Sequence, residues 1–158
     1  MTPSPSRIPA GFHTATPYLI VENAPAAIEF YRRAFGAEEL MRHTDDTGRV
    51  RHAEIRIGDS PLMIGQPFEW EGVRARTPRE AAAITMALYL YVDDPDALHA
   101  RAVSAGAAVQ TPMSDTWYGE RMGGVTDPFG HVWWIAARIE ELSDDEARER
   151  MAANPRAS

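Results

Sequence analysis

The sequence of 158 residues contains no cysteine, which excludes disulfides, thiolate metal sites and a cysteine nucleophile. No apolar run reaches about 18 residues, so we expect no membrane-spanning helix, and Met1 to Ala10 lacks the apolar stretch of a secretory signal. Basic residues are outnumbered by acidic ones, and the net charge of -7 disfavours binding to nucleic acid or anionic membranes. We therefore expect a cytoplasmic protein whose partners are small molecules.

The composition suits one globular domain, since 44% of the residues are hydrophobic. Proline and serine dominate the first six positions, so residues 1–12 are expected to form a flexible tail. The domain itself is expected over residues 13–138. Residues 139–158 follow as a charged surface helix, capped by Ser143, and a fraying tail.

One pattern occurs twice along the chain. Val21 opens a segment that ends at Gly36, and Val92, about 71 residues later, opens a second segment that ends at Gly106. In each copy an alternating strand leads to an Asn or Asp helix cap, a helix and a closing glycine. Half a small domain cannot bury its sheet face alone. The two copies are therefore expected to pack together, or to pair with a second chain, and to form a shared concave surface.

The repeat places a first module at residues 13–66 and a second at residues 85–138. Residues 67–84 join them, and because this stretch has neither a helical nor a strand period we expect a surface loop, which can also act as a lid. A further loop is expected from Pro112 to Gly119. It is followed by a hairpin that turns at Asp127 to Gly130.

Several residues of the second module have structural interpretations. Trp133 is expected in the core, and His99 and His131 are expected on the surface. The run from Gly119 to Gly124 has no helix start behind it, so it predicts a strand bend or bulge and not a phosphate-binding loop.

Short motifs then point to a family. The first set is Phe30-Tyr31, Val92-Asp93-Asp94 and Asp127-Pro128-Phe129-Gly130-His131. With the two strand-helix-strand-strand-strand units, they resemble the vicinal oxygen chelate superfamily of glyoxalases, bleomycin resistance proteins and extradiol dioxygenases. A second set is similar to its PhnB-like subgroup: Thr16 to Leu19, His52 to Glu54 and Trp117 to Arg121. The resemblance implies an α+β fold of two βαβββ modules, forming a cup-shaped mixed β-sheet covered by helices, and commonly a homodimer.

Metal-dependent members of this superfamily hold a divalent ion at four positions, on the first and last strand of each module. The counterparts in this sequence are Thr16, Met63, Ala87 and Trp134. None of these is a good ligand for a hard divalent cation, so we expect no metal cofactor. The alternative is a displaced metal site built from His13, His52 and Glu54.

Three polar residues alternate on one face of the expected strand from Arg51 to Ile57: His52, Glu54 and Arg56. A histidine beside a glutamate can act as a general base, and an arginine can hold a carboxylate or phosphate. One interpretation is therefore a lyase, isomerase or dioxygenase-like enzyme that uses His52 and Glu54. The other is that the three groups neutralise one another or meet water at the sheet edge.

Aromatic residues form the largest part of the predicted site. Alternation points tyrosines and a tryptophan into the cup, where they either form the walls of a site for a planar organic molecule or fill the core. The full predicted ligand-binding set is Thr16, Tyr18, His52, Glu54, Arg56, Met63, Tyr89, Tyr91, Trp117, Tyr118, Arg121 and Trp134. The function predicted from the sequence is metal-independent binding of a small, planar or aromatic molecule.

Overall fold

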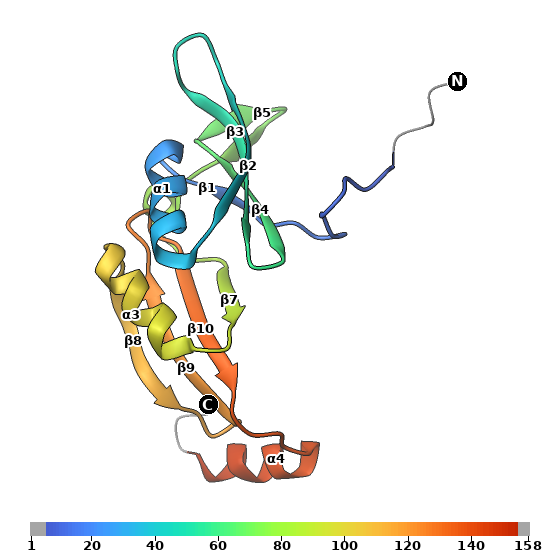
Figure 1. Ribbon diagram of the computed structural model, residues 1–158, viewed down its shortest axis with the longest axis vertical. Coiled ribbons are helices and arrows are strands. Elements are labelled where there is room, and N and C mark those ends of the chain that lie inside the picture. The colour runs from blue at the N-terminus through green and yellow to red at the C-terminus, as the bar shows by residue number, and fades with distance from the viewer. Residues whose placement is uncertain (1–5, 155–158) are drawn as a thin grey trace. The chain divides into compact units, whose positions relative to one another are not determined.

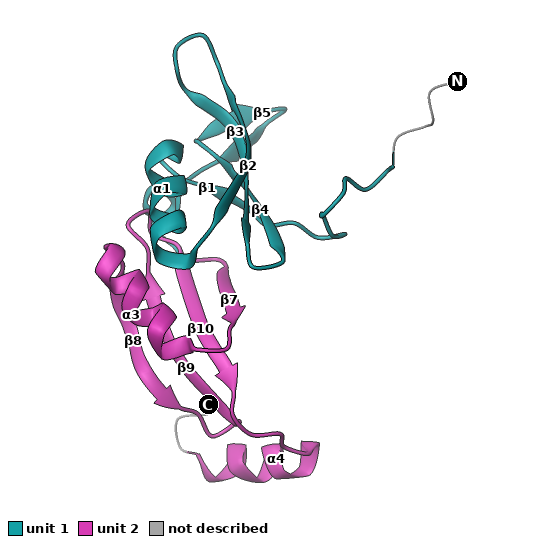
Figure 2. Cartoon of the chain, in the orientation of Figure 1, with its two compact units in different colours: residues 1–83 teal, residues 84–158 magenta. Residues whose placement is uncertain are grey.

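The computed structural model describes residues 6–154, and the chain forms two compact units, residues 1–83 and residues 84–158 (Figures 1 and 2). Both units contain a four-stranded mixed sheet and follow the strand-helix-strand-strand-strand order. The predicted α+β class with two βαβββ modules is therefore confirmed. The expected tail at residues 1–12 contains no helix or strand from residue 6 onward, and its first five residues lie outside the described part.

Unit 1 is a four-stranded sheet with one helix against it. Its elements are β1 (Tyr18–Ile20), α1 (Ala24–Phe35), β2 (Glu38–Thr44), β3 (Val50–Ile57) and β4 (Ser60–Gly65). The strands lie in the order β1-β4-β3-β2, with β1 parallel to β4 and the other pairs antiparallel. Antiparallel neighbours need only short hairpins, and the helical crossover provides the length that parallel pairing requires.

Helix α1 begins and ends where the sequence predicts. The Asn23 side chain accepts a hydrogen bond from the backbone N–H of Ala26 at 3.0 Å and is the N-cap. Gly36 ends the helix with φ at 69°, a left-handed conformation that favours glycine because it has no Cβ. The aromatic pair Phe30 and Tyr31 is almost fully buried and anchors the helix.

Strand β3 separates the two faces of the sheet in unit 1. Ala53 and Ile55 are fully buried on the face that α1 covers. His52 and Glu54 alternate with them and lie on the other face, which we call the open face of unit 1. The predicted alternation of β3 is confirmed.

The segment after unit 1's sheet is not the loop that we predicted. It forms a hairpin of β5 (Phe68–Trp70) and β6 (Val73–Ala75) followed by helix α2 (Pro78–Ala81). The hairpin turns at Glu71 and Gly72, which both have positive φ, and a capping box joins Thr77 and Glu80. The turn and the capping box stabilise these short elements locally. The sequence did not predict them because they are too short to show a hydrophobic period.

Unit 2 repeats the arrangement and adds a C-terminal helix. Its elements are β7 (Ala87–Tyr91), α3 (Pro95–Ala105), β8 (Ala108–Asp115), β9 (Glu120–Thr126), β10 (Val132–Arg138) and α4 (Asp144–Ala153). The strand order is β7-β10-β9-β8, with β7 parallel to β10. Tyr18 pairs with Met63 in unit 1, and Tyr89 pairs with Trp134 in unit 2. The sequence repeat therefore corresponds to a repeated strand register.

The expected loop from Pro112 to Gly119 is shorter than predicted. Strand β8 continues through Asp115, which pairs with Arg121 of β9. Proline is tolerated here because β8 is an edge strand, and its register with β9 is irregular between Thr111 and Ser114.

The predicted surface positions of His99 and His131 are wrong, since these residues are only 8% and 9% exposed. His99 lies on α3 above Gly123, where an added Cβ would come within 3.0 Å of the imidazole ring. Strand β9 pairs regularly with β10 through this point, but its register with β8 shifts on both sides of the pair of Thr111 and Gly124. Gly123 and Gly124 therefore make room for neighbouring side chains, and the predicted bend or bulge corresponds to this irregular pairing with β8.

The hairpin between β9 and β10 turns where the sequence predicts, around the carboxylate of Asp127. One carboxylate oxygen accepts hydrogen bonds from the backbone N–H groups of Phe129 and His131, at 2.8 and 2.9 Å. The other accepts one from the indole of Trp133 at 2.9 Å. Trp133 is fully buried, as predicted.

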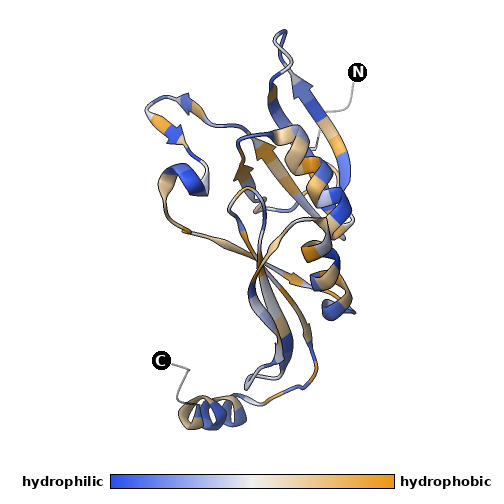
Figure 3. Ribbon diagram, turned by 90° about the vertical axis from the view of Figure 1, so that its left-hand side faces the viewer, coloured by the Kyte–Doolittle hydropathy of each residue, from blue (hydrophilic) through white to orange (hydrophobic). Residues whose placement is uncertain are grey.

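Helix α4 has Ser143 as its N-cap, in a capping box with Glu146. Hydrophilic residues follow the helix along most of its length (Figure 3). Within residues 6–154, no helix is both long and apolar enough to cross a membrane.

Candidate functional site

Three polar side chains meet on the open face of unit 1. The Nδ1 atom of His52 lies 3.4 Å from the Tyr18 hydroxyl, and its Nε2 atom lies 3.3 Å from Oε1 of Glu54. A neutral imidazole protonated on Nε2 can donate to Glu54 and accept from Tyr18. Glu54 therefore favours the tautomer in which Nδ1 carries the lone pair and is the acceptor.

A pocket of about 340 Å³ opens beside this cluster. Its aromatic walls come from β1 and β5, where the rings of Tyr18 and Phe68 lie 6.2 Å apart at 31°. The Arg49 guanidinium is held at the rim by the carbonyl oxygen of Pro67, at 2.6 Å. The full lining is Tyr18, Arg49, Val50, Arg51, Gln66, Pro67, Phe68, Glu69 and Trp70. Burial raises the pKa of Tyr18, which keeps its hydroxyl a proton donor.

The structure does not bring all predicted residues of unit 1 into this cluster. Arg56 is held by Glu38 of β2, with 2.5 Å between Nη2 and Oε2, so its guanidinium is already neutralised at the sheet edge. Thr16 lies before β1 and is half-buried. Phe68, Trp70 and Arg49 were not predicted, and the hairpin that carries the two aromatic residues has no period that could have revealed them.

The residues at the expected metal positions do not fit a divalent ion. Met63 of β4 and Trp134 of β10 occupy corresponding places beside Tyr18 and Tyr89, and neither has a hard oxygen or imidazole ligand. Within either unit of the described chain, no three His, Asp or Glu side chains come close enough to share an ion. The alternative site from His13, His52 and Glu54 is therefore not assembled.

In unit 2 a second cluster forms on the face turned away from α3, which we call the open face of unit 2. The carboxylate of Glu120 accepts hydrogen bonds from the hydroxyls of Tyr89 and Tyr91, the latter at 2.6 Å. The hydroxyls of Tyr89 and Tyr118 also contact the sulfur of Met122, at 3.1 and 3.3 Å. Burial, followed by the bond to Glu120, raises the pKa of Tyr89.

Glu120 lies within the motif from Trp117 to Arg121, but it was not predicted as a site residue. Glu120 and Met122 are two residues apart on β9, so strand alternation places both side chains on the same face of the sheet, and this spacing could have identified Glu120. By the same alternation, Arg121 points to the other face.

Arg121 therefore does not join the ligand-binding cluster, contrary to the prediction. Its guanidinium lies 2.6 Å from Asp96 of α3 and 3.2 Å from Asp115 of β8. The bond to Arg121 lowers the pKa of Asp96, so both groups stay charged. Arg121 links the helix to the sheet.

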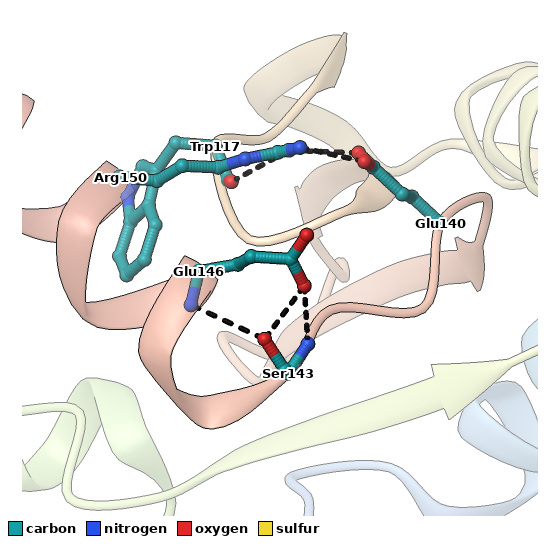
Figure 4. Close-up of polar contacts among 5 residues, drawn as sticks. All are labelled: Trp117, Glu140, Ser143, Glu146 and Arg150. Atoms are coloured by element: carbon teal, nitrogen blue, oxygen red, sulfur yellow. Dashed lines mark hydrogen bonds and ion pairs between the residues drawn. The ribbon is translucent and has the colours of Figure 1, made fainter.

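Two tryptophans complete unit 2's open face. Trp134 is half-buried, and its ring lies over Gly124, where an added Cβ would come within 2.7 Å. Trp117 contacts Tyr118 edge to face, with ring centroids 5.1 Å apart. Arg150 of α4 bonds the carboxylate of Glu140 at 2.6 and 2.7 Å and the carbonyl oxygen of Trp117 at 3.5 Å (Figure 4). Helix α4 thereby supports the loop that carries Trp117.

Comparisons with known proteins agree with this architecture. The family model described as Glyoxalase/Bleomycin resistance protein/Dioxygenase superfamily matches residues 12–135. A protein of Mycobacterium tuberculosis is 36% identical over 139 residues, which cover 87% of this chain and 82% of that protein. The crystal structure of TioX from Micromonospora sp. ML1 has a TM-score of 0.62 at 24% identity and covers 83% of this chain and 100% of its own. A PhnB protein from Bacillus cereus has a TM-score of 0.60 at 19% identity, and the match covers 79% of this chain and 99% of that protein. These two structures show the shared fold.

Proposed function

Since the chain belongs to the glyoxalase/bleomycin resistance protein/dioxygenase superfamily, we propose that it binds a small, planar or aromatic organic molecule without a divalent metal. The observation that carries this proposal is the pocket on the open face of unit 1, with rings of Tyr18, Phe68 and Trp70 in its lining. The rings of Tyr18 and Phe68, inclined at 31°, and the indole of Trp70 give an aromatic surface that suits a planar ligand. Arg49 and Arg51 outnumber Glu69 in the same lining. Arg51 also lies 3.8 Å from Asp45, so Arg49 is the cation that best favours a ligand with an anionic group.

The test uses 1-anilinonaphthalene-8-sulfonate, which is aromatic and anionic. We expect it to quench tryptophan fluorescence saturably, because Trp70 lines the pocket and is 69% exposed. Trp70→Phe should remove most of this quenching while Trp117→Phe, the matched control in unit 2, retains it. Equal quenching in both variants, or quenching that never saturates, would contradict the proposal.

Metal independence has its own test. Elemental analysis of the purified protein should find much less than one transition metal ion per chain, and a chelator should leave the quenching unchanged. One tightly bound ion per chain would overturn this part of the proposal. Homodimer formation and a cytoplasmic location remain predictions from the sequence, which size-exclusion chromatography and cell fractionation test.

A second candidate function is favoured by the contacts of His52. Its Nδ1 atom faces Tyr18, and Glu54 supports the opposite ring nitrogen, which is the arrangement of a general base with an orienting carboxylate. The candidate reaction is abstraction of a proton next to a carbonyl group, as in an isomerase or lyase.

Deuterium incorporation into a panel of enolisable carbonyl compounds tests this candidate by NMR. His52→Gln should lower the exchange rate about a hundredfold. The same variant should bind 1-anilinonaphthalene-8-sulfonate as the native chain does, because the lining of the pocket does not include His52. If the native chain exchanges no compound of the panel faster than buffer, this candidate function is rejected.

A further inference from the structure

The open face of unit 2 holds a carboxylate between aromatic rings. Glu120 accepts the hydroxyl hydrogens of Tyr89 and Tyr91, whose ring centroids are 5.1 Å apart with 41° between the ring planes. Tyr118 approaches from the loop before β9, and its hydroxyl meets Met122 beside that of Tyr89. Two phenols therefore bond to one carboxylate, and a third lies beside them.

Glu120 forms no ion pair with an Arg or His among the residues that the structure describes. Arg138 lies opposite Glu120 in the register of β9 and β10, but the ion pair that Arg138 forms is with Glu141, at 3.9 Å. The bond to Glu120 raises the pKa of Tyr91, so its phenol remains a neutral donor. A half-buried carboxylate that accepts from neutral donors and forms no ion pair attracts a cation from solution.

A pocket of about 670 Å³ opens beside Glu120 and Tyr91. Its lining is Tyr91, Val92, Asp93, Glu120, Ala137 and Arg138. The two carboxylates outnumber the single guanidinium, which is also 3.9 Å from Glu141. The lining is therefore negative overall, and the pocket is large enough for an organic molecule.

An aromatic face, here that of Tyr91 in the lining, and a carboxylate are the groups that recognise organic cations, through the ring quadrupole and through direct charge attraction. A bare divalent ion would need several oxygen ligands, and here one carboxylate already accepts two hydroxyls. We propose that the open face of unit 2 binds a small organic cation, a quaternary ammonium or protonated amine, with Glu120 as its counter-ion. The site goes beyond the proposed function and does not require the pocket of unit 1.

Choline and its uncharged isostere 3,3-dimethylbutanol test this site on the full chain. Isothermal titration or NMR titration should show saturable binding of choline. The isostere has nearly the same shape without the charge, and it should bind about tenfold more weakly or not measurably. Equal affinity for the two compounds would overturn the proposal.

Three variants locate the site. Glu120→Gln should weaken choline binding about tenfold, because it removes the counter-ion and keeps the size of the side chain. Arg138→Gln should strengthen binding about twofold, since it removes a repelling charge, and a gain in affinity cannot come from unfolding. Trp70→Phe in unit 1 should leave choline binding unchanged, which separates this site from the pocket of unit 1. Unchanged affinity in Glu120→Gln, or weaker binding in Arg138→Gln, would contradict the assignment.

Discussion

Replacing Asp127 with alanine is expected to lower the free energy of unfolding by about 3 to 5 kcal/mol. The carboxylate is 3% exposed and accepts from two backbone N–H groups and from the indole of Trp133. Alanine removes both acceptor oxygens and with them all three hydrogen bonds. Each buried donor that loses its acceptor costs about 1 to 3 kcal/mol. Urea unfolding followed by circular dichroism measures the effect.

Two further variants show whether hydrogen bonding causes this loss. Asp127→Asn keeps an acceptor for the backbone but places an N–H group toward the indole of Trp133, so an intermediate loss is expected. Asp59→Ala is the matched control in unit 1, because Asp59 is exposed and accepts from the Ser60 hydroxyl. It should change stability by less than about 0.5 kcal/mol. A loss below about 1 kcal/mol in Asp127→Ala would show that the turn does not depend on this carboxylate.

The second large effect is expected in the core of unit 1. Phe30→Ala should lower the free energy of unfolding by about 3 to 5 kcal/mol, because a 2% exposed ring is replaced by a cavity. The ring also loses edge-to-face contacts with Tyr31 and Phe35, at 5.5 and 6.0 Å between centroids. Urea unfolding again gives the measurement.

Phe68→Ala provides the comparison for Phe30→Ala. It makes the same chemical change in the same unit, but Phe68 is 36% exposed on the short strand β5. A loss of less than about 1 kcal/mol is expected, since little buried area is removed. Similar losses in the two variants would mean that burial of Phe30 does not determine the stability of unit 1.

Residues that act through local chemistry were predicted from the sequence. Asn23 and Gly36 delimit α1 because capping depends on a side-chain oxygen and on a backbone conformation within a few residues. The buried and open sides of β3 follow from period-two alternation, which placed His52 and Glu54 together. The sequence repeat likewise corresponds to the matching registers of Tyr18 and Tyr89 in the structure.

Side-chain partners were not predictable in this way. Arg56 and Arg121 looked available for a ligand, yet each is held by a carboxylate that alternation alone does not identify: Glu38 on β2 for Arg56, and Asp96 on α3 for Arg121. Glu120 was not predicted as a site residue for a related reason. Its place in the cluster depends on hydrogen bonds from Tyr89 and Tyr91, which lie about 30 residues earlier in the chain. Burial of His99 depends on the missing side chain of Gly123.

The sequence by itself determined the repeated order of strands and helix, the helix caps, the main turns and the face on which each strand residue lies. These features depend on interactions within a few residues and on the period of the backbone. Only the tertiary structure decided which charges are neutralised within the protein and which remain for a ligand. That distinction depends on distances between strands and helices far apart in the chain. It separates Arg121, which is bound within unit 2, from Glu120, which forms no ion pair among the residues that the structure describes.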